Sequence, residues 1–258
     1  MTINPVFLLL GAFVGLLVGL TGMGGASLMT PLLVLVAGVR PVVAVGTDIA
    51  YSLIAKLVGG AVHARQRTVD WGVTLRLAAG SGPGALLGVL VLSRYKTQLS
   101  EAELDKQVLH WVGMMLIVVA LVMAARIVMP LLAKNAAWLT PKTSSPVWLP
   151  ALGAVTGFLV GLTSVGSGTL VVPVLSLFTL LPAATLVGTD IAHAVLLLAI
   201  ASFGHVALGT VNFVMAANLA LGSIPGVIVG SRLCARVPEP PLRLAIASVL
   251  LISAAKLL

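Results

Sequence analysis

The chain has 258 residues, of which 59% are hydrophobic and 9% are charged, and its mean hydropathy is +1.16. A soluble domain has roughly 25% charged residues, so this composition excludes an ordinary soluble protein and predicts that lipid surrounds most of the chain. The net charge of +8 comes from Lys and Arg residues that stand singly between apolar runs. This spacing argues against nucleic acid as a partner and is typical of positive-inside topology signals. The single cysteine, Cys234, excludes an intrachain disulfide and a cysteine-based metal cage.

The first predicted elements are two short apolar runs, residues 6–20 and 28–37, around the glycine-rich sequence GLTGMGGASLMTP at residues 19–31. Each run is shorter than the ~20 residues that a full membrane crossing needs. Glycine, serine and threonine between the runs weaken a helix. We therefore predict two short or half-length helices that meet near the middle of the membrane, with a re-entrant hairpin as one form of this arrangement.

Three longer apolar runs follow each broken pair and predict ordinary transmembrane helices. Segment 97–107 (TQLSEAELDKQ) has a Ser-x-x-Glu capping pattern at Ser100 and Glu103 and is predicted to form a short surface helix before the next crossing. Segment 134–146 (KNAAWLTPKTSSP) is polar and contains Ser, Thr and Pro, so it is the predicted inter-lobe linker. The predicted crossings are residues 42–62, 71–92, 108–132, 184–208, 213–233 and 242–258.

The sequence repeats itself without a gap at an offset of 142 residues, from Gly11 against Gly153 to Arg94 against Arg236. This long register indicates a tandem duplication. We predict an N-terminal lobe at residues 1–133, the linker at 134–146 and a C-terminal lobe at 147–258. The repeated blocks are the runs 148–162 and 170–180 around GLTSVGSGTLVVP (161–173), VGTDIA (45–50 and 187–192), and GSGPG (80–84) against GSIPG (222–226).

Loop charges predict how the two lobes are oriented. Arg65 and Arg67 lie between two predicted crossings, whereas their repeat partners, Ala207 and Gly209, are neutral. With the basic loops in the cytoplasm and the acidic loop at residues 101–105 outside, each lobe crosses the membrane an odd number of times. The predicted fold is an all-α polytopic membrane protein whose two homologous lobes form an inverted repeat. Each lobe has a broken or re-entrant helix pair plus three transmembrane helices.

The two glycine-rich breaks are the predicted binding site for a small anion. Half-helices that end there leave backbone N–H groups unpaired, and their aligned dipoles add partial positive charge. Close packing of helices through small residues is the structural alternative. The duplication and the neighbouring hydroxyl groups favour a site. The residues are Thr21, Gly22, Gly24 and Gly25 in the first break and Thr163, Ser164, Gly166, Ser167 and Gly168 in the second.

Two basic residues inside the predicted crossings are candidates for attracting the anion, because charges in a membrane are costly and are found mainly at functional sites. Lys56 has Leu198 at its repeat position, and Arg76 has Asn218. This asymmetry between the lobes favours a functional role for the two basic residues over a purely structural one. Snorkelling of Lys56 to the interface, or its pairing with Asp48, remains an alternative.

Three further residues are candidates for coupling transport to a proton or cation. Asp48 and Asp190 occupy the same position in the repeated GTDIA sequence. Their place near the start of predicted helices also fits a cap to backbone N–H groups, and the sequence leaves the two roles open. His193 follows the second GTDIA, and histidine titrates near neutral pH. His63 and His205 fall at predicted helix ends, where interfacial or dipole-partner roles are favoured.

Three function classes fit these features: a secondary transporter, a channel-like anion uniporter and an intramembrane serine hydrolase. The hydrolase would pair Ser167 with His193 or His205. The repeat position of Ser167 is Gly25, so the sequence disfavours this reading and predicts that the protein is not an enzyme. The chain has no nucleotide-binding loop, so we predict neither a cofactor nor direct ATP coupling. The sequence leaves homo-oligomer formation open.

The duplicated glycine-rich turn, the repeated VGTDIA and the GSGPG and GSIPG segments resemble the TauE/SafE sulfite exporter family of bacterial membrane permeases. The resemblance covers nearly the whole chain. It implies secondary transport of a small sulfur-containing oxyanion, of the sulfite, sulfonate or sulfoacetate type, across the bacterial cytoplasmic (inner) membrane. It assigns the pocket to residues 21–26 and 163–168, supported by residues 46–50 and 188–192. Because the two turns differ in sequence, we expect an asymmetric pocket.

Overall fold

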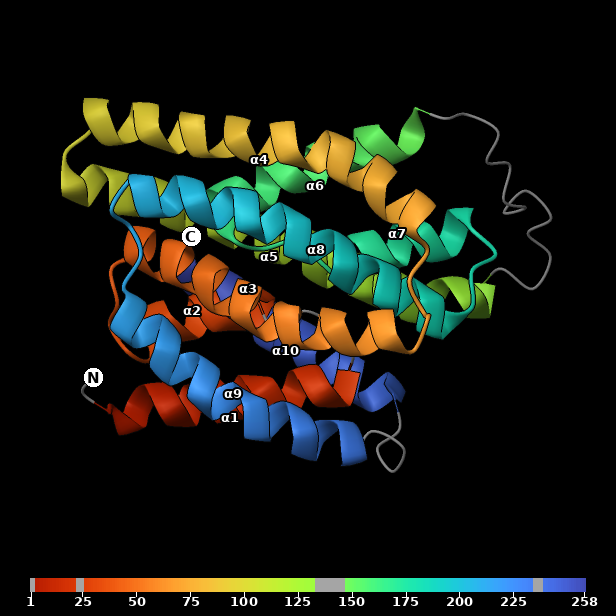
Figure 1. Ribbon diagram of the computed structural model, residues 1–258. Coiled ribbons are helices and arrows are strands. Elements are labelled where there is room, and N and C mark those ends of the chain that lie inside the picture. The colour runs from red at the N-terminus through yellow and green to blue at the C-terminus, as the bar shows by residue number, and fades with distance from the viewer. Residues whose placement is uncertain (1–2, 22–25, 133–146, 234–238) are drawn as a thin grey trace.

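The computed structural model describes residues 3–21, 26–132, 147–233 and 239–258, and this part of the chain is helical apart from its loops (Figure 1). The predicted all-α class is therefore confirmed for the described residues. The helices are α1 (Pro5–Thr21), α2 (Ala26–Leu35), α3 (Pro41–Arg65), α4 (Trp71–Gln98), α5 (Glu101–Leu132), α6 (Trp148–Thr163), α7 (Val171–Phe178), α8 (Ala183–Ala207), α9 (Phe213–Leu233) and α10 (Glu239–Leu257).

The protein is a multi-pass membrane protein. Within the described ranges, five helical segments are long and apolar enough to cross a membrane. The sixth predicted crossing, residues 242–258, is also helical, because it forms most of α10, and its stretch Leu244–Leu257 is apolar. The five candidate spans are Pro41–Arg65, Trp71–Gln98, Glu101–Ala125, Ala183–Ala207 and Phe213–Gly230.

Both predicted pairs of short helices are present. Helices α1 and α2 have 17 and 10 residues, and their repeat counterparts α6 and α7 have 16 and 8. Residues 164–170 interrupt the second pair without regular helix, as the run of glycine, serine and threonine predicts. The first break at residues 22–25 lies outside the described residues.

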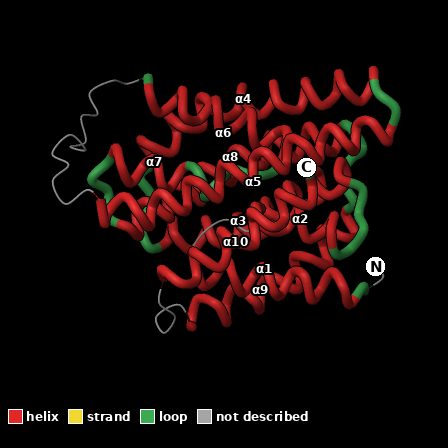
Figure 2. The backbone as a smooth tube through the Cα atoms, turned by 180° about the vertical axis from the view of Figure 1, so that it is seen from behind, coloured by secondary structure: helices red, strands yellow, loops and turns green. Residues whose placement is uncertain are grey.

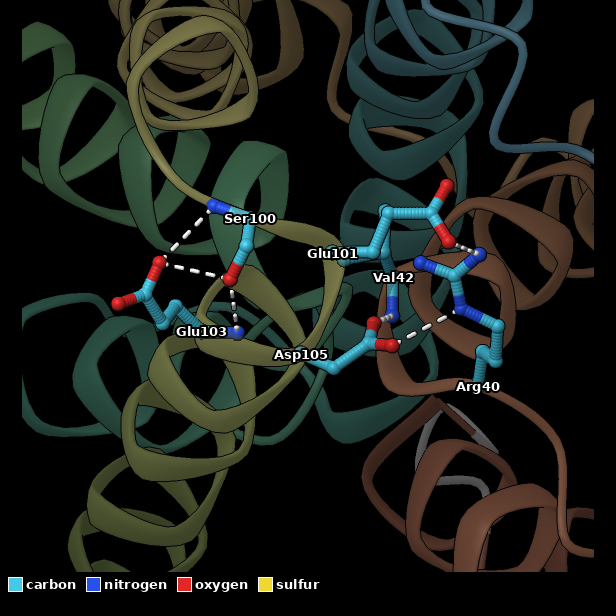
Figure 3. Close-up of polar contacts among 6 residues, drawn as sticks. All are labelled: Arg40, Val42, Ser100, Glu101, Glu103 and Asp105. Atoms are coloured by element: carbon cyan, nitrogen blue, oxygen red, sulfur yellow. Dashed lines mark hydrogen bonds and ion pairs between the residues drawn. The ribbon is translucent and has the colours of Figure 1, made fainter.

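The acidic segment between α4 and α5 differs from the prediction, because it is not a separate short helix. It forms the first turns of α5, and the capping pair starts that long helix directly (Figure 3). The backbone N–H of Ser100 donates to Glu103 Oε2 at 2.9 Å, and the N–H of Glu103 donates to Ser100 Oγ at 3.4 Å. Arg40, just before α3, donates to Glu101 at 2.8 Å and to Asp105 at 2.9 Å. These contacts join the starts of α3 and α5.

Each lobe gives one helix to two tightly packed pairs, α1 with α9 and α4 with α6. The pairs lie on opposite sides of the bundle, with α3 and α8 between them (Figures 1 and 2). A Cβ added at Gly80 would collide with the carbonyl oxygen of Pro150, and one added at Gly222 would collide with that of Leu8. These two contacts are repeat equivalents. The glycines of GSGPG and GSIPG therefore allow close backbone packing of these pairs.

The loops that follow α3 and α8 each dock on the central helix of the other lobe. The backbone N–H of Asp70 donates to Thr189 Oγ1 of α8, and the N–H of Asn212 donates to Thr47 Oγ1 of α3, both at 3.0 Å. The glycine before each threonine lies directly against the docked loop, where a Cβ would collide with its backbone. The Gly-Thr part of VGTDIA thus holds the lobes together, and the aspartate that follows is left free for other contacts.

Candidate functional site

The second glycine-rich break forms a buried turn between α6 and α7. Ser164 has a left-handed φ of 64°, and Gly166 and Gly168 have φ of 134° and 80°, which glycine adopts without strain. Ser164 and Ser167 have no exposed surface. Thr163 Oγ1 accepts the backbone N–H two residues further on, at 3.2 Å. The turn therefore places hydroxyl and N–H groups inside the protein.

Asp48 of α3 lies at one side of this turn and binds three hydroxyl groups. Its Oδ2 accepts from Thr30 of α2 and from Ser164 of the turn, both at 2.6 Å, and its Oδ1 accepts from Ser52 at 3.2 Å. Asp48 is completely buried. It is not a helix cap, because α3 begins at Pro41, a full two turns earlier. The carboxylate instead ties α2 and α3 to the second break.

Lys56 and Asp190 meet at the other side of the turn. Lys56 Nζ donates to Ser167 Oγ at 3.2 Å and lies 3.9 Å from Asp190 Oδ2. Asp190 Oδ1 accepts the backbone N–H of Gly168 at 3.1 Å. The Lys56 and Asp190 side chains are only 11% and 4% exposed, so an ammonium, a hydroxyl and a backbone N–H converge in the interior. We call Lys56, Ser167, Gly168 and Asp190 the Lys56 cluster. Lys56 therefore neither snorkels nor forms an ion pair with Asp48.

The two lobes also meet at the breaks themselves. Ser27, at the start of α2, donates from Oγ to Oγ1 of Thr169 at 3.4 Å, and the two residues hold the same repeat position. The predicted site residues Gly22, Gly24 and Gly25, and the side chain of Thr21, lie outside the described residues. The described half of the predicted pocket comes from the second break.

His193 lies on α8 within the same interior and is fully buried. Its Nε2 is 2.9 Å from Ser81 Oγ of α4. Its Nδ1 is the one buried side-chain nitrogen or oxygen in the described part of the chain that has no hydrogen-bond partner. Native proteins pair nearly all such atoms, so an orphan marks a position where a further group could bind.

Arg76, the other predicted anion-binding cation, is not part of the Lys56 cluster. It lies in the second turn of α4 and is exposed. No hydrogen bond or ion pair joins it to Lys56 or Asp190 in the described residues. A long basic side chain near a helix end reaches the membrane surface without cost, which explains its place there.

The remaining predicted histidines lie in the last turns of α3 and α8, as the sequence indicated. Nδ1 of His63 is 2.8 Å from Thr68 Oγ1, and Nδ1 of His205 is 2.9 Å from Thr210 Oγ1, so the repeat conserves the contact. His205 also bonds the carbonyl oxygen of Gly161 at 2.9 Å. Both histidines therefore brace the loops that dock on the other lobe. An intramembrane serine hydrolase would require a histidine that contacts Ser167. Among the described residues, the hydrogen bonds of His193 and His205 go to other residues, and Ser167 bonds Lys56.

Several hydroxyl residues of the interior were missed by sequence reasoning. Thr30 and Ser52 stand among apolar residues and Ser81 lies in the small-residue block GSGPG, and hydroxyl residues are common in both settings for packing reasons. The one available signal was the four-residue spacing of Asp48 and Ser52, which places both on one helix face. Among the described residues, no group of three or more His, Cys, Asp or Glu side chains is placed to hold a metal ion.

Comparisons with known protein sequences identify the family to which this chain belongs. The sequence pattern described as "Sulfite exporter TauE/SafE" matches residues 7–257. The chain belongs to the TauE/SafE sulfite exporter family. The resemblance noted in the repeated motifs is thereby confirmed, and this TauE/SafE protein is a membrane transporter rather than an enzyme.

Relatives of the TauE/SafE chain align with nearly its full length. It is 42% identical over 253 residues to the "Probable membrane transporter protein YjnA" of Bacillus subtilis (strain 168), covering 97% of this chain and 98% of the relative. It is 30% identical over 248 residues to a "Probable membrane transporter protein" of Xylella fastidiosa (strain Temecula1), covering 92% and 87%. A second Bacillus subtilis relative, YunE, is 25% identical, over 90% of this chain and 87% of its own. No solved structure gives a significant match to the chain.

Proposed function

We propose that this protein is a secondary transporter that exports or moves a small sulfur-containing oxyanion of the sulfite, sulfonate or sulfoacetate type across the bacterial cytoplasmic membrane. The family description, sulfite exporter, supports the substrate class. The described helices support the placement of a site in the protein interior, where irregular backbone is tolerated because protein groups satisfy it.

The observation that carries the proposal is the buried ammonium of Lys56 beside the turn. Ser167 accepts a hydrogen bond from it, and the backbone N–H of Gly168 lies next to the same carboxylate that faces Lys56. An ammonium, a hydroxyl and a backbone N–H together form the donor set that a small oxyanion needs. The repeat position, Leu198, is fully buried and apolar, so the site is asymmetric.

We further propose that the two lobes form an inverted repeat around this site. The reciprocal docking of the loops after α3 and α8 supports it, because each contact has its repeat equivalent with the lobes exchanged. The opposite chain directions of α3 and α8 in Figure 1, followed by colour, are also expected of such a repeat. Alternating access would then follow from rocking one lobe against the other.

Coupling to protons is assigned to the buried titratable groups Asp48, Asp190 and His193. Each lies within the interior that contains Lys56 and the break, and none is exposed. A buried carboxylate or imidazole can carry a proton between two conformations of a transporter. Asp48 and Asp190 contact different sides of the turn, so protonation of either would change how the break is held.

Flux through reconstituted vesicles tests the proposed function. The expected result is uptake of labelled sulfite that saturates with concentration and responds to a pH or ion gradient. Large ohmic anion current without saturation would instead indicate a channel-like uniporter. If neither sulfite nor a small sulfonate crossed the vesicle membrane under any gradient, the proposed substrate class would be wrong.

A further inference from the structure

A carboxylate of the protein occupies the donor groups that the proposed anion would use. Asp190 Oδ2 faces Lys56 Nζ at 3.9 Å, and Asp190 Oδ1 accepts from the Gly168 N–H at 3.1 Å. Both charged side chains are almost completely buried, so neither finds a substitute partner in water. An incoming oxyanion and the Asp190 carboxylate therefore compete for the same ammonium and the same N–H group.

Charges on the surrounding helices leave Lys56 as the cation that compensates Asp190 in the described residues. On α3, Asp48 is held by hydroxyl groups, and His63 and Arg65 lie in the last turn, where His63 bonds Thr68 and Arg65 is exposed. On α8, His193 bonds Ser81, and His205 in the last turn bonds Thr210. Helices α6 and α7 contain no titratable side chain. The titratable groups of α4 are Arg76, Arg94 and Lys96, which are exposed, and Tyr95, which packs on Trp111. If an anion bound Lys56 while Asp190 stayed charged, two negative charges would share one buried cation, which is strongly unfavourable.

A displaced and protonated Asp190 has a hydrogen-bond acceptor within reach. His193 lies three residues further along α8, so the two side chains share one helix face. Side chains on a helix lean toward its N-terminus, which directs His193 toward Asp190. With the Nε2 proton donated to Ser81, Nδ1 is an acceptor, and it is the atom that has no partner in this structure.

We propose, on the basis of the anion transport proposed above, that Asp190 is an internal competitor of the transported anion. The anion binds Lys56 and the Gly168 N–H as Asp190 leaves them. One proton from the water on the entry side forms an O–H bond on Asp190, which then donates to His193 Nδ1. Release reverses both steps, so one proton moves with each anion in the same direction. For a monoanion the buried charge is the same before and after binding.

Isothermal titration calorimetry on the purified full-length protein in detergent tests this exchange, with sulfite and with methanesulfonate as the probes. Linkage requires the wild-type affinity to fall about tenfold per pH unit as the pH rises, because each bound anion brings one proton. Asp190→Asn keeps the acceptor for the Gly168 N–H but cannot exchange a proton. Its affinity for methanesulfonate should not depend on pH, and it should exceed that of the wild type at high pH.

Sulfite itself takes up a proton near neutral pH, so its binding can depend on pH in every variant. The quantity compared for sulfite is therefore the slope of the logarithm of the affinity against pH, in the wild type and in Asp190→Asn. A difference of about one between the two slopes supports the exchange for either probe, and with methanesulfonate the slope should be absent in Asp190→Asn. Saturable binding with the same slope in both proteins would overturn the exchange and leave the anion site intact. A slope removed by Asp48→Asn instead would overturn it by assigning the proton to Asp48. Absence of binding by both probes would overturn the proposed function itself.

His193→Gln tests the acceptor separately. Glutamine can still bond Ser81 from the position of Nε2, but it has no atom in the place of Nδ1. The affinity at a given pH should fall several-fold while the pH slope remains, because the protonated carboxyl loses its acceptor. An unchanged affinity would remove His193 from the exchange.

Discussion

Asp48 and Asp190 hold the same repeat position, but their surroundings differ. Asp48 binds three hydroxyl groups, whereas Asp190 faces Lys56 and a backbone N–H. The difference follows from single residues that the duplication did not keep, such as Lys56 against Leu198. The sequence could therefore predict that both carboxylates lie inside the protein and that the two repeat positions have different neighbours. It could not predict the partners, because those come from helices distant in the chain.

Asp48 should be more important for stability through its shape and polarity than through its charge. Asp48→Asn keeps an oxygen for one hydroxyl group, and its amide can donate to another, since hydroxyl oxygens also accept. Asp48→Leu leaves Thr30, Ser52 and Ser164 without this acceptor, at a cost of about 1–3 kcal/mol. We expect the unfolding temperature in detergent to fall clearly for Asp48→Leu and little for Asp48→Asn. Equal losses in both would show that the charge itself stabilises the fold.

At the scale of the elements, hydrophobic run lengths and glycine positions predicted most helices to within a few residues. The short pairs α1 with α2 and α6 with α7 were predicted because each run is too short for a full crossing. The acidic segment was misassigned, because a capping pair marks where a helix begins but not how far that helix extends. The sequence did not predict which helices pack together. The packing of α4 on α6 depends on backbone approach at glycines, and their spacing does not identify the partner helix.

Gly80 provides a test of this packing. Alanine there would collide with the backbone carbonyl of Pro150, so Gly80→Ala should destabilise the protein by about 1–3 kcal/mol. Gly59 is the matched control, because a Cβ on this α3 glycine meets only the side chain of Ile191 at 3.6 Å. Gly59→Ala should be neutral or stabilising by up to about 1 kcal/mol, from helix propensity. Thermal unfolding in detergent measures both, and equal effects would contradict the assigned role of Gly80.

At the scale of the whole molecule, the proposed inverted repeat predicts opposite exposure of equivalent positions. Gln66 and Leu208 occupy the same repeat position at the ends of α3 and α8, and neither is buried. Single cysteines placed there, in a chain with Cys234 replaced by serine, should react with a membrane-impermeant maleimide from opposite faces of the membrane. Neither substitution changes the loop charge that sets topology. Labelling of both from one face would indicate a parallel repeat.

The proposed function depends on the ammonium of Lys56 binding the transported anion. The double variant Lys56→Leu/Asp190→Asn, compared with Asp190→Asn alone, removes the ammonium without leaving an unpaired carboxylate. Leucine is the residue at the equivalent position of the other lobe, so folding should be retained. Arg76→Leu is the control for a loss of positive charge elsewhere, because Arg76 is exposed and forms no hydrogen bond or ion pair with the described Lys56 cluster.

The most direct measurement is the affinity of each purified variant for sulfite and methanesulfonate by calorimetry. The Coulomb energy of an ion pair at ~4 Å and an effective dielectric constant of ~20 is about 4 kcal/mol, and each 1.4 kcal/mol corresponds to about tenfold in affinity. Since part of this energy is offset by desolvation, we predict that the double variant binds at least about tenfold more weakly than Asp190→Asn. Arg76→Leu should bind as the wild type does. Equal affinity of the double variant and Asp190→Asn would contradict the assignment of Lys56 to the anion site.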